Sequence, residues 1–316
     1  MTKKQKQHPP TIASKIFTID IESIPGASGP SLLWIGDRHT AKKFVLLIHG
    51  GGFYISLNTG HLEWGLQSYI RACSGGATSS FEDSDVAVAM LDYSLSPEAV
   101  YPTQLIEVSL ALKHLLQQPR VTPGNLLIGG DSAGGTLTAQ LLSHLVWPHP
   151  QAVRVELSEP LAGAFLVSPW VGGCDGEERQ ASWRENAHTD MITLEFIRGL
   201  ETMNFGGTSW EQERAEGKGW ALPLDVGPSW FGGLDAVARH VYVTAGQLEP
   251  LRDQGIEYAT RLSEKTKGSK LEVRLDVLEG QAHEFIVLEA GAGKGGPALA
   301  KMNNWARSAF GIQSVV

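Results

Sequence analysis

A serine set between glycines carries the clearest chemical signal in this sequence. Residues Gly130 to Gly134 read G-x-S-x-G with Ser132 at the centre, between an apolar run and a helical pattern. This context is typical of a sharp strand-to-helix turn that exposes the serine hydroxyl, and the flanking glycines remove side chains that would clash there. Such a hydroxyl can attack a carbonyl carbon. Ser132 is therefore the predicted nucleophile, with a plain glycine-rich turn as the alternative.

A run of glycines upstream supports this interpretation. His49 to Phe53 read H-G-G-G-F directly after the apolar run Phe44–Ile48. When a serine attacks a carbonyl, negative charge collects on the oxygen, and backbone N–H groups of consecutive glycines can approach closely enough to stabilise it. A phosphate-binding loop is the rival interpretation, but the sequence contains no G-x-x-x-x-G-K-[ST] pattern. We therefore expect an oxyanion-stabilising loop that His49 holds in place.

Two further side chains supply the base and the carboxylate that a nucleophilic serine requires. His283 follows the apolar run Leu271–Leu278, and Glu249 follows the run His240–Thr244. Both stand at the carboxyl ends of predicted strands, which is where ligands bind open α/β sheets. We predict His283 as the base and Glu249 as the acid.

Asp253 is a second candidate for the acid. Pro250 is favoured at the first helical position, so Glu249 lies near the N-cap, where glutamate is not a preferred residue. Asp253 lies in the first helical turn, where a negative charge is ordinary. The helix dipole explains a carboxylate at Asp253, whereas capping preferences leave Glu249 unexplained, which favours a functional role for Glu249.

The elements that position these residues alternate along the chain. Continuous apolar runs are typical of strands buried on both faces, and three- and four-residue steps between apolar residues are typical of helices. The predicted strands are Lys15–Glu22, Leu32–Ile35, Phe44–Ile48, Val86–Asp92, Asn125–Gly129, Leu161–Ser168, His240–Thr244 and Leu271–Leu278. The predicted helices are His61–Cys73, Thr103–Gln118, Ala133–Val146, Leu251–Lys265 and Ala298–Phe310. This alternation predicts an α/β fold with a mostly parallel central sheet and helices on both faces.

One stretch interrupts the alternation. Residues 172–237 contain no strong strand pattern but carry charges and several tryptophans. A departure of this length inside a regular α/β chain indicates an inserted cap. The predicted organisation is a catalytic core formed by residues 1–171 and 238–316, with residues 172–237 as the cap. Phe53, Trp183 and Trp210 are expected to line an apolar substrate pocket, with core packing as the alternative for the tryptophans.

The composition limits the partners. Lys and Arg number 26 and Asp and Glu number 34, so the formal net charge is −8, which argues against binding to nucleic acid or to an anionic membrane. No apolar segment follows the lysines of residues 1–10, so no secretory signal is expected. The longest uncharged stretch, Ser132–Val153, contains too many polar residues for a membrane span. With only two cysteines, Cys73 and Cys174, a cytoplasmic location is expected.

No cofactor and no metal ion are expected. Gly291–Gly296 satisfies G-x-G-x-x-G, but a dinucleotide site needs this motif after the first strand with an acid about twenty residues later. Phe310 and Gly311 stand at that distance here, so the motif is interpreted as a loop before the last helix. The sequence contains neither H-E-x-x-H nor C-x-x-C.

Taken together, these motifs resemble the hormone-sensitive-lipase-like branch of the α/β-hydrolase fold. The matching segments are His49-Gly-Gly-Gly-Phe53, Asp92-Tyr-Ser-Leu-Ser-Pro-Glu98, Gly130-Asp-Ser-Ala-Gly-Gly135, Ser168-Pro-Trp170, Pro250-Leu-Arg-Asp253 and His283. The order Ser132, Glu249, His283 is also that of α/β-hydrolases. The resemblance implies that Ser132 is the nucleophile and His283 the base. It further implies that Gly51, Gly52 and Ala133 supply the amides of the oxyanion hole, and that the protein could form a homodimer.

The sequence departs from the family pattern at several positions. Glu249 stands where the family usually has Asp, Ser94 where it has Arg, and Glu284 where glycine commonly follows the histidine. Many relatives carry an N-terminal helical cap, whereas the strand pattern here begins near Lys15. Access to the site is therefore expected to be more open than in such relatives.

The expected function is that of a serine carboxylesterase that acts on a small-molecule ester through an acyl-enzyme. Hydrolysis or transfer at an amide, lactone or lactam is the nearest alternative, because the same three groups serve all of these reactions. A non-catalytic small-molecule receptor on the same scaffold is the alternative from another class, and the presence of His283 argues against it.

Overall fold

The computed structural model describes residues 20–26, 29–73, 84–175, 180–293 and 295–312. Within these residues the chain forms an eight-stranded sheet in the order β1-β2-β4-β3-β5-β6-β7-β8. The strands are β1 (Asp20–Ser23), β2 (Ser31–Ile35), β3 (Lys43–Ile48), β4 (Val86–Asp92), β5 (Leu126–Asp131), β6 (Gly163–Val167), β7 (His240–Gly246) and β8 (Glu272–Leu278). β2 pairs antiparallel with β1 and β4, and the remaining neighbours are parallel. The predicted mostly parallel sheet is confirmed.

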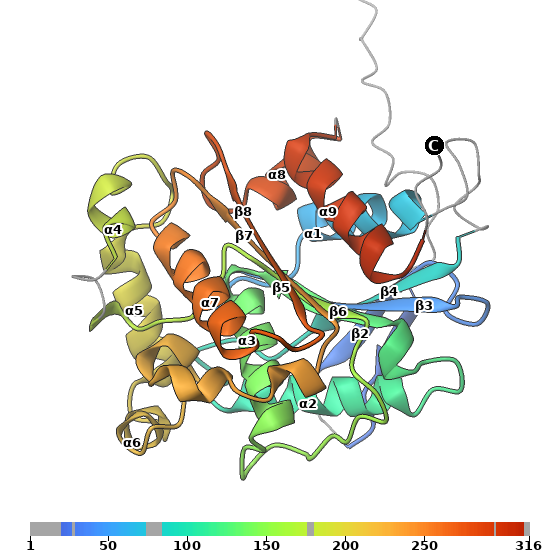
Figure 1. Ribbon diagram of the computed structural model, residues 1–316, viewed down its shortest axis with the longest axis horizontal. Coiled ribbons are helices and arrows are strands. Elements are labelled where there is room, and N and C mark those ends of the chain that lie inside the picture. Colours follow the sequence, from blue (N-terminus) through green and yellow to red (C-terminus); the bar gives the residue numbers. More distant parts are fainter. Residues whose placement is uncertain (1–19, 27–28, 74–83, 176–179, 294, 313–316) are drawn as a thin grey trace, which may run out of the picture.

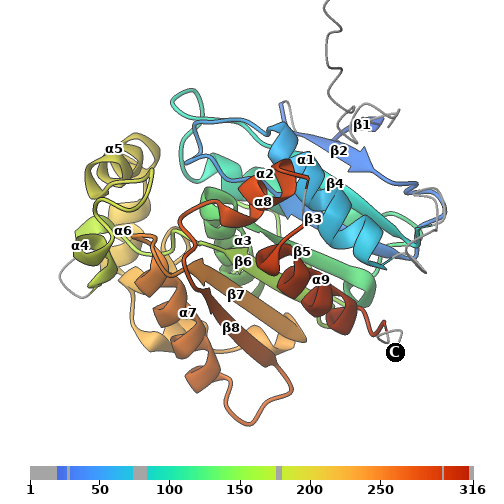
Figure 2. The same ribbon diagram turned by 90° about the horizontal axis from the view of Figure 1, so that it is seen from above.

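Helices cover both faces of this sheet (Figures 1 and 2). One face carries α1 (Thr59–Gly65), α8 (Phe285–Gly291) and α9 (Pro297–Ala309), and the other carries α2 (Thr103–Leu116), α3 (Ser132–Val146) and α7 (Arg252–Lys265). Strand β3 shows why the strands are apolar throughout: Leu46 and Ile48 pack in the core under α2 and α3, whereas Val45 and Leu47 pack in the core under α1 and α9. Successive side chains of a strand point to opposite faces, so a central strand with both faces covered needs a continuous apolar run.

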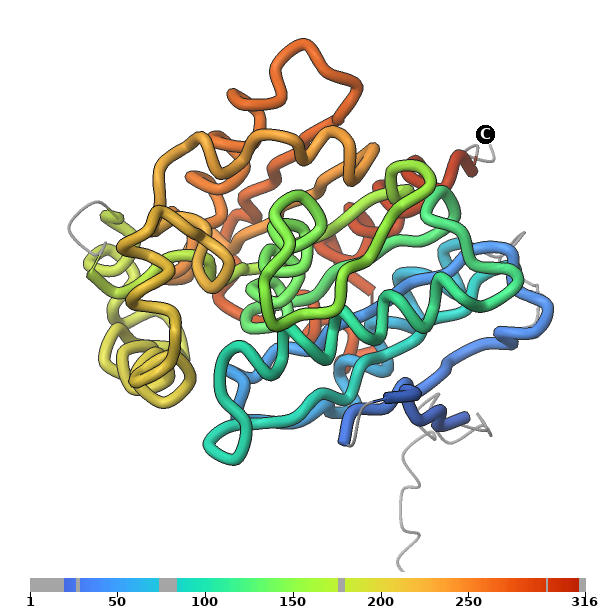
Figure 3. The backbone as a smooth tube through the Cα atoms, turned by 90° about the horizontal axis from the view of Figure 1, so that it is seen from below, coloured from blue at the N-terminus to red at the C-terminus, as the bar shows by residue number. Residues whose placement is uncertain are grey.

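The segment between β6 and β7 departs from the layered arrangement. It contains α4 (Ser182–Glu185), α5 (Leu194–Phe205) and α6 (Trp210–Ala215), followed by three short 3₁₀ turns at Pro223–Asp225, Pro228–Phe231 and Leu234–Ala236. Figure 3 shows the yellow part of this segment, with α4–α6, gathered on one side of the molecule. The division of the chain into a core and a cap at residues 172 and 237 stays a prediction.

The predicted strand Lys15–Glu22 is a strand from Asp20 onward, and its residues 15–19 lie outside the described residues. Outside residues 172–237, two helices differ from the predictions by more than two residues. The helix predicted over His61–Cys73 is an α-helix only to Gly65 and continues as a π-helical segment, Leu66–Arg71. α8 was not predicted at all, because its buried Phe285, Ile286 and Val287 are consecutive and give no helical period.

None of the helices in the described residues is long and apolar enough to cross a membrane.

Candidate active site

Ser132 lies on the turn between β5 and α3. Its φ of 49° is in the left-handed region, which is rare for residues with a side chain and is found at functional sites. The flanking glycines are required by close packing, since a Cβ on Gly130 or on Gly134 would lie 2.0 Å from the carbonyl oxygen of Ile48. Only glycine at both positions lets this turn pack against the end of β3, which leads directly into the glycine loop.

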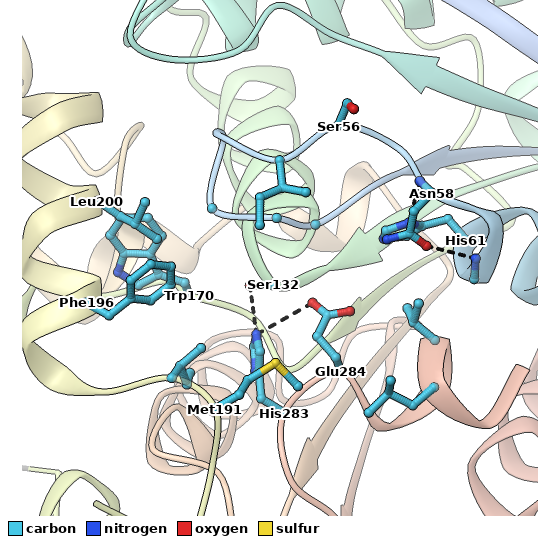
Figure 4. Close-up of a pocket in the computed structure, with 18 of the residues that line it drawn as sticks. Ser56, Asn58, His61, Ser132, Trp170, Met191, Phe196, Leu200, His283 and Glu284 are labelled. Atoms are coloured by element: carbon cyan, nitrogen blue, oxygen red, sulfur yellow. Dashed lines mark hydrogen bonds and ion pairs between the residues drawn. The ribbon is translucent and has the colours of Figure 1, made fainter. Parts of the chain in front are cut away.

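His283 connects Ser132 to Glu249. The Nε2 atom of His283 lies 2.9 Å from Ser132 Oγ, and its Nδ1 atom lies 3.1 Å from Glu249 Oε2. The second carboxylate oxygen of Glu249 accepts a hydrogen bond from the Gly246 backbone N–H at 3.0 Å, and the side chain is fully buried. Figure 4 shows the hydrogen bond between His283 and Ser132. The structure thus brings together the three residues predicted as nucleophile, base and acid.

Opposing influences act on the pKa of His283. Burial lowers this pKa, but the hydrogen bond to Glu249 and the charge of that carboxylate outweigh burial, so the pKa of His283 is raised above its usual range. The backbone N–H of His283 also donates to Asp190 Oδ2 at 2.6 Å, and the charge of Asp190 acts in the same direction. The imidazole is therefore held in one orientation and accepts a proton readily.

Asp253, the other candidate for the acid, lies away from the histidine. Its Oδ2 atom accepts a hydrogen bond from the Ser182 backbone N–H at 2.8 Å, and its Oδ1 atom pairs with Arg252 Nε at 2.9 Å. The contact with Ser182 connects the start of α7 to the segment between β6 and β7. The Asp253 carboxylate is therefore occupied by contacts to Ser182 and Arg252 and does not contact His283.

The glycine loop is fixed by buried polar contacts around His49. His49 stacks on Tyr93 with ring centroids 4.2 Å apart, and its Nδ1 lies 2.7 Å from the Gly50 carbonyl oxygen. Burial lowers the pKa of His49 to about 4, so the ring is neutral. Gly51 and Gly52 have φ of 104° and 64°, and both line the cavity beside Ser132. His49 holds the loop as expected.

A cavity of about 510 Å³ opens over Ser132 and His283. One side, called here the apolar side, is formed by Trp170, Met191, Ile192, Phe196, Ile197 and Leu200. The other side contains most of the polar groups and is called here the polar side; it is formed by Ser56, Asn58, His61 and Glu284 together with the apolar Val287 and Leu288. Figure 4 shows Trp170, Phe196 and Leu200 grouped away from Ser56, Asn58 and His61, with Ser132 and His283 between the two groups.

Phe53, Trp183 and Trp210, which were expected to line the pocket, are not among the cavity-lining residues. All three are buried, with exposed fractions of 2%, 4% and 8%. Phe53 and Trp210 both pack against Phe205, at centroid distances of 6.2 and 5.4 Å. Large aromatic side chains bury the most apolar area when they pack against each other, so here they form the core beneath the cavity wall.

A group of three residues beside the cavity was not foreseen from the sequence. His61, Asp131 and Glu284 place one ligand-type atom each within 4.8 Å of one another, in a cluster beside Ser132. Asp131 also accepts a hydrogen bond from the Gly50 backbone N–H at 3.1 Å. Two features of this group are visible in the sequence: Asp131 directly precedes Ser132, and Glu284 follows His283 where the family commonly has glycine. No sequence pattern indicates that His61 or Asp190 belongs to the site.

The hydrogen bonds of His61, Asp131 and Glu284 indicate that these three residues hold protons between them and not a metal ion. His61 Nδ1 accepts from the Asn58 backbone N–H at 3.3 Å, so the ring proton is on Nε2, which faces Asp131 Oδ2 at 3.4 Å. A nitrogen that carries a proton is not a metal ligand. Burial and the neighbouring Asp131 carboxylate raise the pKa of Glu284 well above its usual range, whereas the pKa of Asp131 is lowered because the effects of His61 and Glu284 outweigh burial.

Comparison with known proteins identifies the class. A model of the alpha/beta hydrolase fold matches residues 45–287, and the chain belongs to that family. Within it, the chain is a hydrolase of the carboxylesterase and lipase type, of the hormone-sensitive-lipase-like branch that its motifs indicated.

Individual relatives differ in what they cleave. Neutral cholesterol ester hydrolase 1 of Pongo abelii is 35% identical over 300 residues, which cover 78% of this chain and 68% of that protein. Arylacetamide deacetylase of Oryctolagus cuniculus is 27% identical over 273 residues, covering 71% of this chain and 64% of that protein. Carboxyl esterase 2 of the mycorrhizal fungus Tuber melanosporum shares the fold, with a TM-score of 0.73 at 18% identity over 98% of this chain and 90% of that one.

Proposed function

We propose that this protein hydrolyses carboxylic esters through an acyl-enzyme formed on Ser132. The observation that carries the proposal is the continuous hydrogen-bonded chain Ser132–His283–Glu249, with distances of 2.9 and 3.1 Å, at the floor of an open cavity. A serine within hydrogen-bond reach of a histidine that a buried carboxylate orients is the arrangement of an activated nucleophile.

The proposed reaction has two halves. Ser132 Oγ loses its proton to His283 Nε2 and forms a bond to the ester carbonyl carbon; the imidazolium then returns this proton to the alcohol oxygen as the C–O bond breaks. Water attacks the acyl-enzyme in the second half, again giving its proton to His283, and the acid is released. Glu249 holds the Nδ1–H and stabilises the imidazolium that forms in each half.

The proposed oxyanion hole consists of the backbone N–H groups of Gly51, Gly52 and Ala133. Gly51 and Gly52 line the cavity beside Ser132, and Ala133 is the first residue after the nucleophile. Donors at these places face a developing negative charge without having to reorganise. The whole reaction therefore uses groups of the chain and water.

The cavity supports a substrate with an apolar part. Six apolar side chains form the apolar side, and a volume of about 510 Å³ accommodates a medium-length acyl or aryl group. The relative named neutral cholesterol ester hydrolase fits this preference. The relative named arylacetamide deacetylase makes the amide bond the second candidate, because the same three groups can cleave it.

A fluorophosphonate probe with a panel of aryl esters tests the proposal. The probe is expected to label the wild-type chain at Ser132 and to leave Ser132→Ala unlabelled, and the esters are expected to be cleaved by the wild type alone. Matched amides and lactones in the same panel define the scope of the reaction. A wild-type chain that binds the esters without labelling or turnover would instead be a receptor.

A further inference from the structure

Glu284, directly after His283, has an unusual backbone conformation for a glutamate. Its φ of 63° is left-handed, a region that glycine adopts freely and that strains other residues. It precedes α8 as the N-cap residue, but its side chain makes no capping hydrogen bond. Strain of this kind persists where the surrounding structure fixes the residue, and it concentrates at functional sites. The position of the carboxyl group is therefore the feature to explain.

The Glu284 carboxyl lies between Asp131 and the base. Its Oε1 atom is 3.6 Å from His283 Nε2, and 18% of the side chain is exposed, on the polar side of the cavity. Figure 4 shows that the dashed lines to Ser132 and to the Glu284 carboxyl leave the same nitrogen, at one end of the His283 ring. Two atoms capable of accepting a hydrogen bond, Ser132 Oγ and Glu284 Oε1, thus flank the same nitrogen.

Asp131 determines the protonation of this carboxyl. Asp131 Oδ1 accepts a hydrogen bond from the Gly50 backbone N–H. Asp131 Oδ2 is buried, faces His61 Nε2 at 3.4 Å and makes no hydrogen bond of good geometry within the described residues. Two carboxyl groups within 4.8 Å of each other disfavour ionisation of both, and the raised pKa of Glu284 favours Glu284 as the group that keeps a proton. With that proton directed to Asp131, the oxygen that faces His283 is a neutral acceptor.

This acceptor lies where the leaving group must be. His283 Nε2 gives its proton to the leaving atom, so this atom has to be within hydrogen-bond distance of Nε2 during acylation. An oxygen 3.6 Å from the same nitrogen is close to the substituents of the leaving atom. We propose, building on the function above, that Glu284 Oε1 accepts a hydrogen bond from a donor on the leaving group.

Two substrate types carry such a donor. One is a secondary amide, whose N–H is on the leaving atom itself, and the other is a monoester of a diol, whose free hydroxyl is on the neighbouring carbon. The remaining polar residues, Ser56, Asn58 and His61, extend the polar side of the cavity beyond Glu284 (Figure 4). The substrate class is therefore an acyl compound with an apolar acyl group toward Leu200 and a donor-bearing leaving group toward Glu284.

Matched substrates isolate the donor. 2-Hydroxyethyl butyrate is compared with 2-methoxyethyl butyrate, in which a methyl group replaces the hydroxyl hydrogen, and N-(4-nitrophenyl)butyramide is compared with 4-nitrophenyl butyrate. The quantity measured is the ratio of kcat/KM within each pair, so that a change common to both substrates cancels. A lower ratio in the first pair alone identifies the hydroxyl as the donor, and a lower ratio in the second alone identifies the amide N–H.

Four variants distinguish the loss of the hydrogen-bond acceptor at position 284 from a change of charge and from a loss of folding. Glu284→Met has a similar length without an acceptor and is expected to lower at least one ratio about tenfold, the size of one hydrogen bond. Glu284→Gln keeps both an acceptor oxygen and a donor for Asp131 and is expected to keep the ratios. Glu284→Gly also removes the acceptor, and glycine adopts the left-handed φ of this position without strain. It therefore replaces Glu284→Met if the methionine variant does not fold. Glu279→Met, at an exposed position four residues before His283, is the matched control.

Ratios that stay at the wild-type value in both acceptor-free variants would overturn this inference, as would a loss in Glu284→Gln equal to that in Glu284→Met. Fluorophosphonate labelling of Ser132 in the same preparations keeps the two proposals apart. Unchanged ratios with intact labelling reject the role of Glu284 alone, whereas a wild-type chain without labelling rejects the proposed function.

Discussion

The Asp131 carboxylate accepts a hydrogen bond from the Gly50 backbone N–H, with 3.1 Å between Oδ1 and N. This contact joins the residue before Ser132 to the first glycine of the loop proposed to form the oxyanion hole. A Cβ on Gly50 would lie 2.1 Å from Asp131 Oδ2, so the two segments approach as closely as they can. One buried side chain therefore sets the distance between the nucleophile and the glycine loop.

Replacing Asp131 should damage stability and turnover together. Asp131→Ala leaves the buried Gly50 N–H without its acceptor, which should cost about 1–3 kcal/mol of unfolding free energy. Asp131→Asn keeps an acceptor oxygen and is the control, expected to lose less. Urea denaturation gives the free energies, and kcat for an aryl acetate follows the site. Equal stability of wild type and Asp131→Ala would contradict the proposed contact.

Ser132→Ala should abolish ester hydrolysis and keep the fold. The change removes one hydroxyl from a residue with a left-handed φ of 49°, so the melting temperature should stay the same or rise slightly. Turnover of 4-nitrophenyl butyrate and circular dichroism are the two measurements. Residual turnover equal to that of the wild type would remove Ser132 as the nucleophile.

The two carboxylates of the β7–α7 segment should separate in kinetics. Glu249→Gln loses the charge that orients and stabilises His283, which should lower kcat by on the order of 10⁴, by analogy with the serine-protease case. Asp253→Asn weakens contacts to Ser182 and Arg252 and should lower the melting temperature with little effect on kcat. The opposite pattern would transfer the role of the acid to Asp253.

The pH dependence of kcat/KM should report the raised pKa of His283. The base must be neutral to accept the serine proton, so activity should be full above this pKa and fall as the pH drops through it. Since the pKa of His283 is raised, the midpoint of the fall should lie above 6.5, the ordinary value. The profile is measured with an uncharged ester at constant ionic strength.

Glu249→Gln provides the control for this profile. Without the carboxylate, burial remains as the main influence and should move the midpoint to lower pH in the residual activity. A wild-type midpoint at or below 6.5 would show that burial outweighs Glu249.

Substrate preference should depend on Leu200 and not on Trp210, which lies outside the cavity lining. Leu200 lines the cavity and lies against Gly52, where an added Cβ would be 2.5 Å from Leu200 Cδ1. Leu200→Ala should enlarge the apolar side and shift the preference toward longer acyl groups. Trp210→Ala should lower the melting temperature, because it leaves a cavity in the core, and keep the preference. Rates for 4-nitrophenyl esters of graded acyl length distinguish the two.

The sequence was most informative where burial leaves little choice. Central strands such as β3 and β4 are covered on both faces, so their apolar runs predict their positions closely. The residues at the ends of β5, β7 and β8 followed from strand order, because parallel strands place their carboxyl ends at one edge. Ser132, Glu249 and His283 could therefore be proposed as neighbours before the structure was known.

Features that depend on tertiary contacts were not predictable. The cluster of His61, Asp131 and Glu284 joins α1, β5 and the residue before α8, and no local pattern encodes such a meeting. The cavity lining was mistaken for a related reason: apolar content marks Trp210 as buried but does not distinguish the core from a cavity wall. α8 begins after a left-handed glutamate, a conformation for which sequence rules expect glycine.

The spacing of Ser132 and His283 has a consequence for biosynthesis. They are separated by 151 positions, and His283 follows β8, the strand at the far edge of the sheet. Contacts between such distant segments form slowly, and this one requires that β7 has paired with β6 and β8 with β7. During translation from the N-terminus, the nucleophile leaves the ribosome well before its base does, so the nascent chain carries a serine that is chemically inert. Hydrolytic power is thus acquired only after β8 has joined the sheet and His283 has reached Ser132.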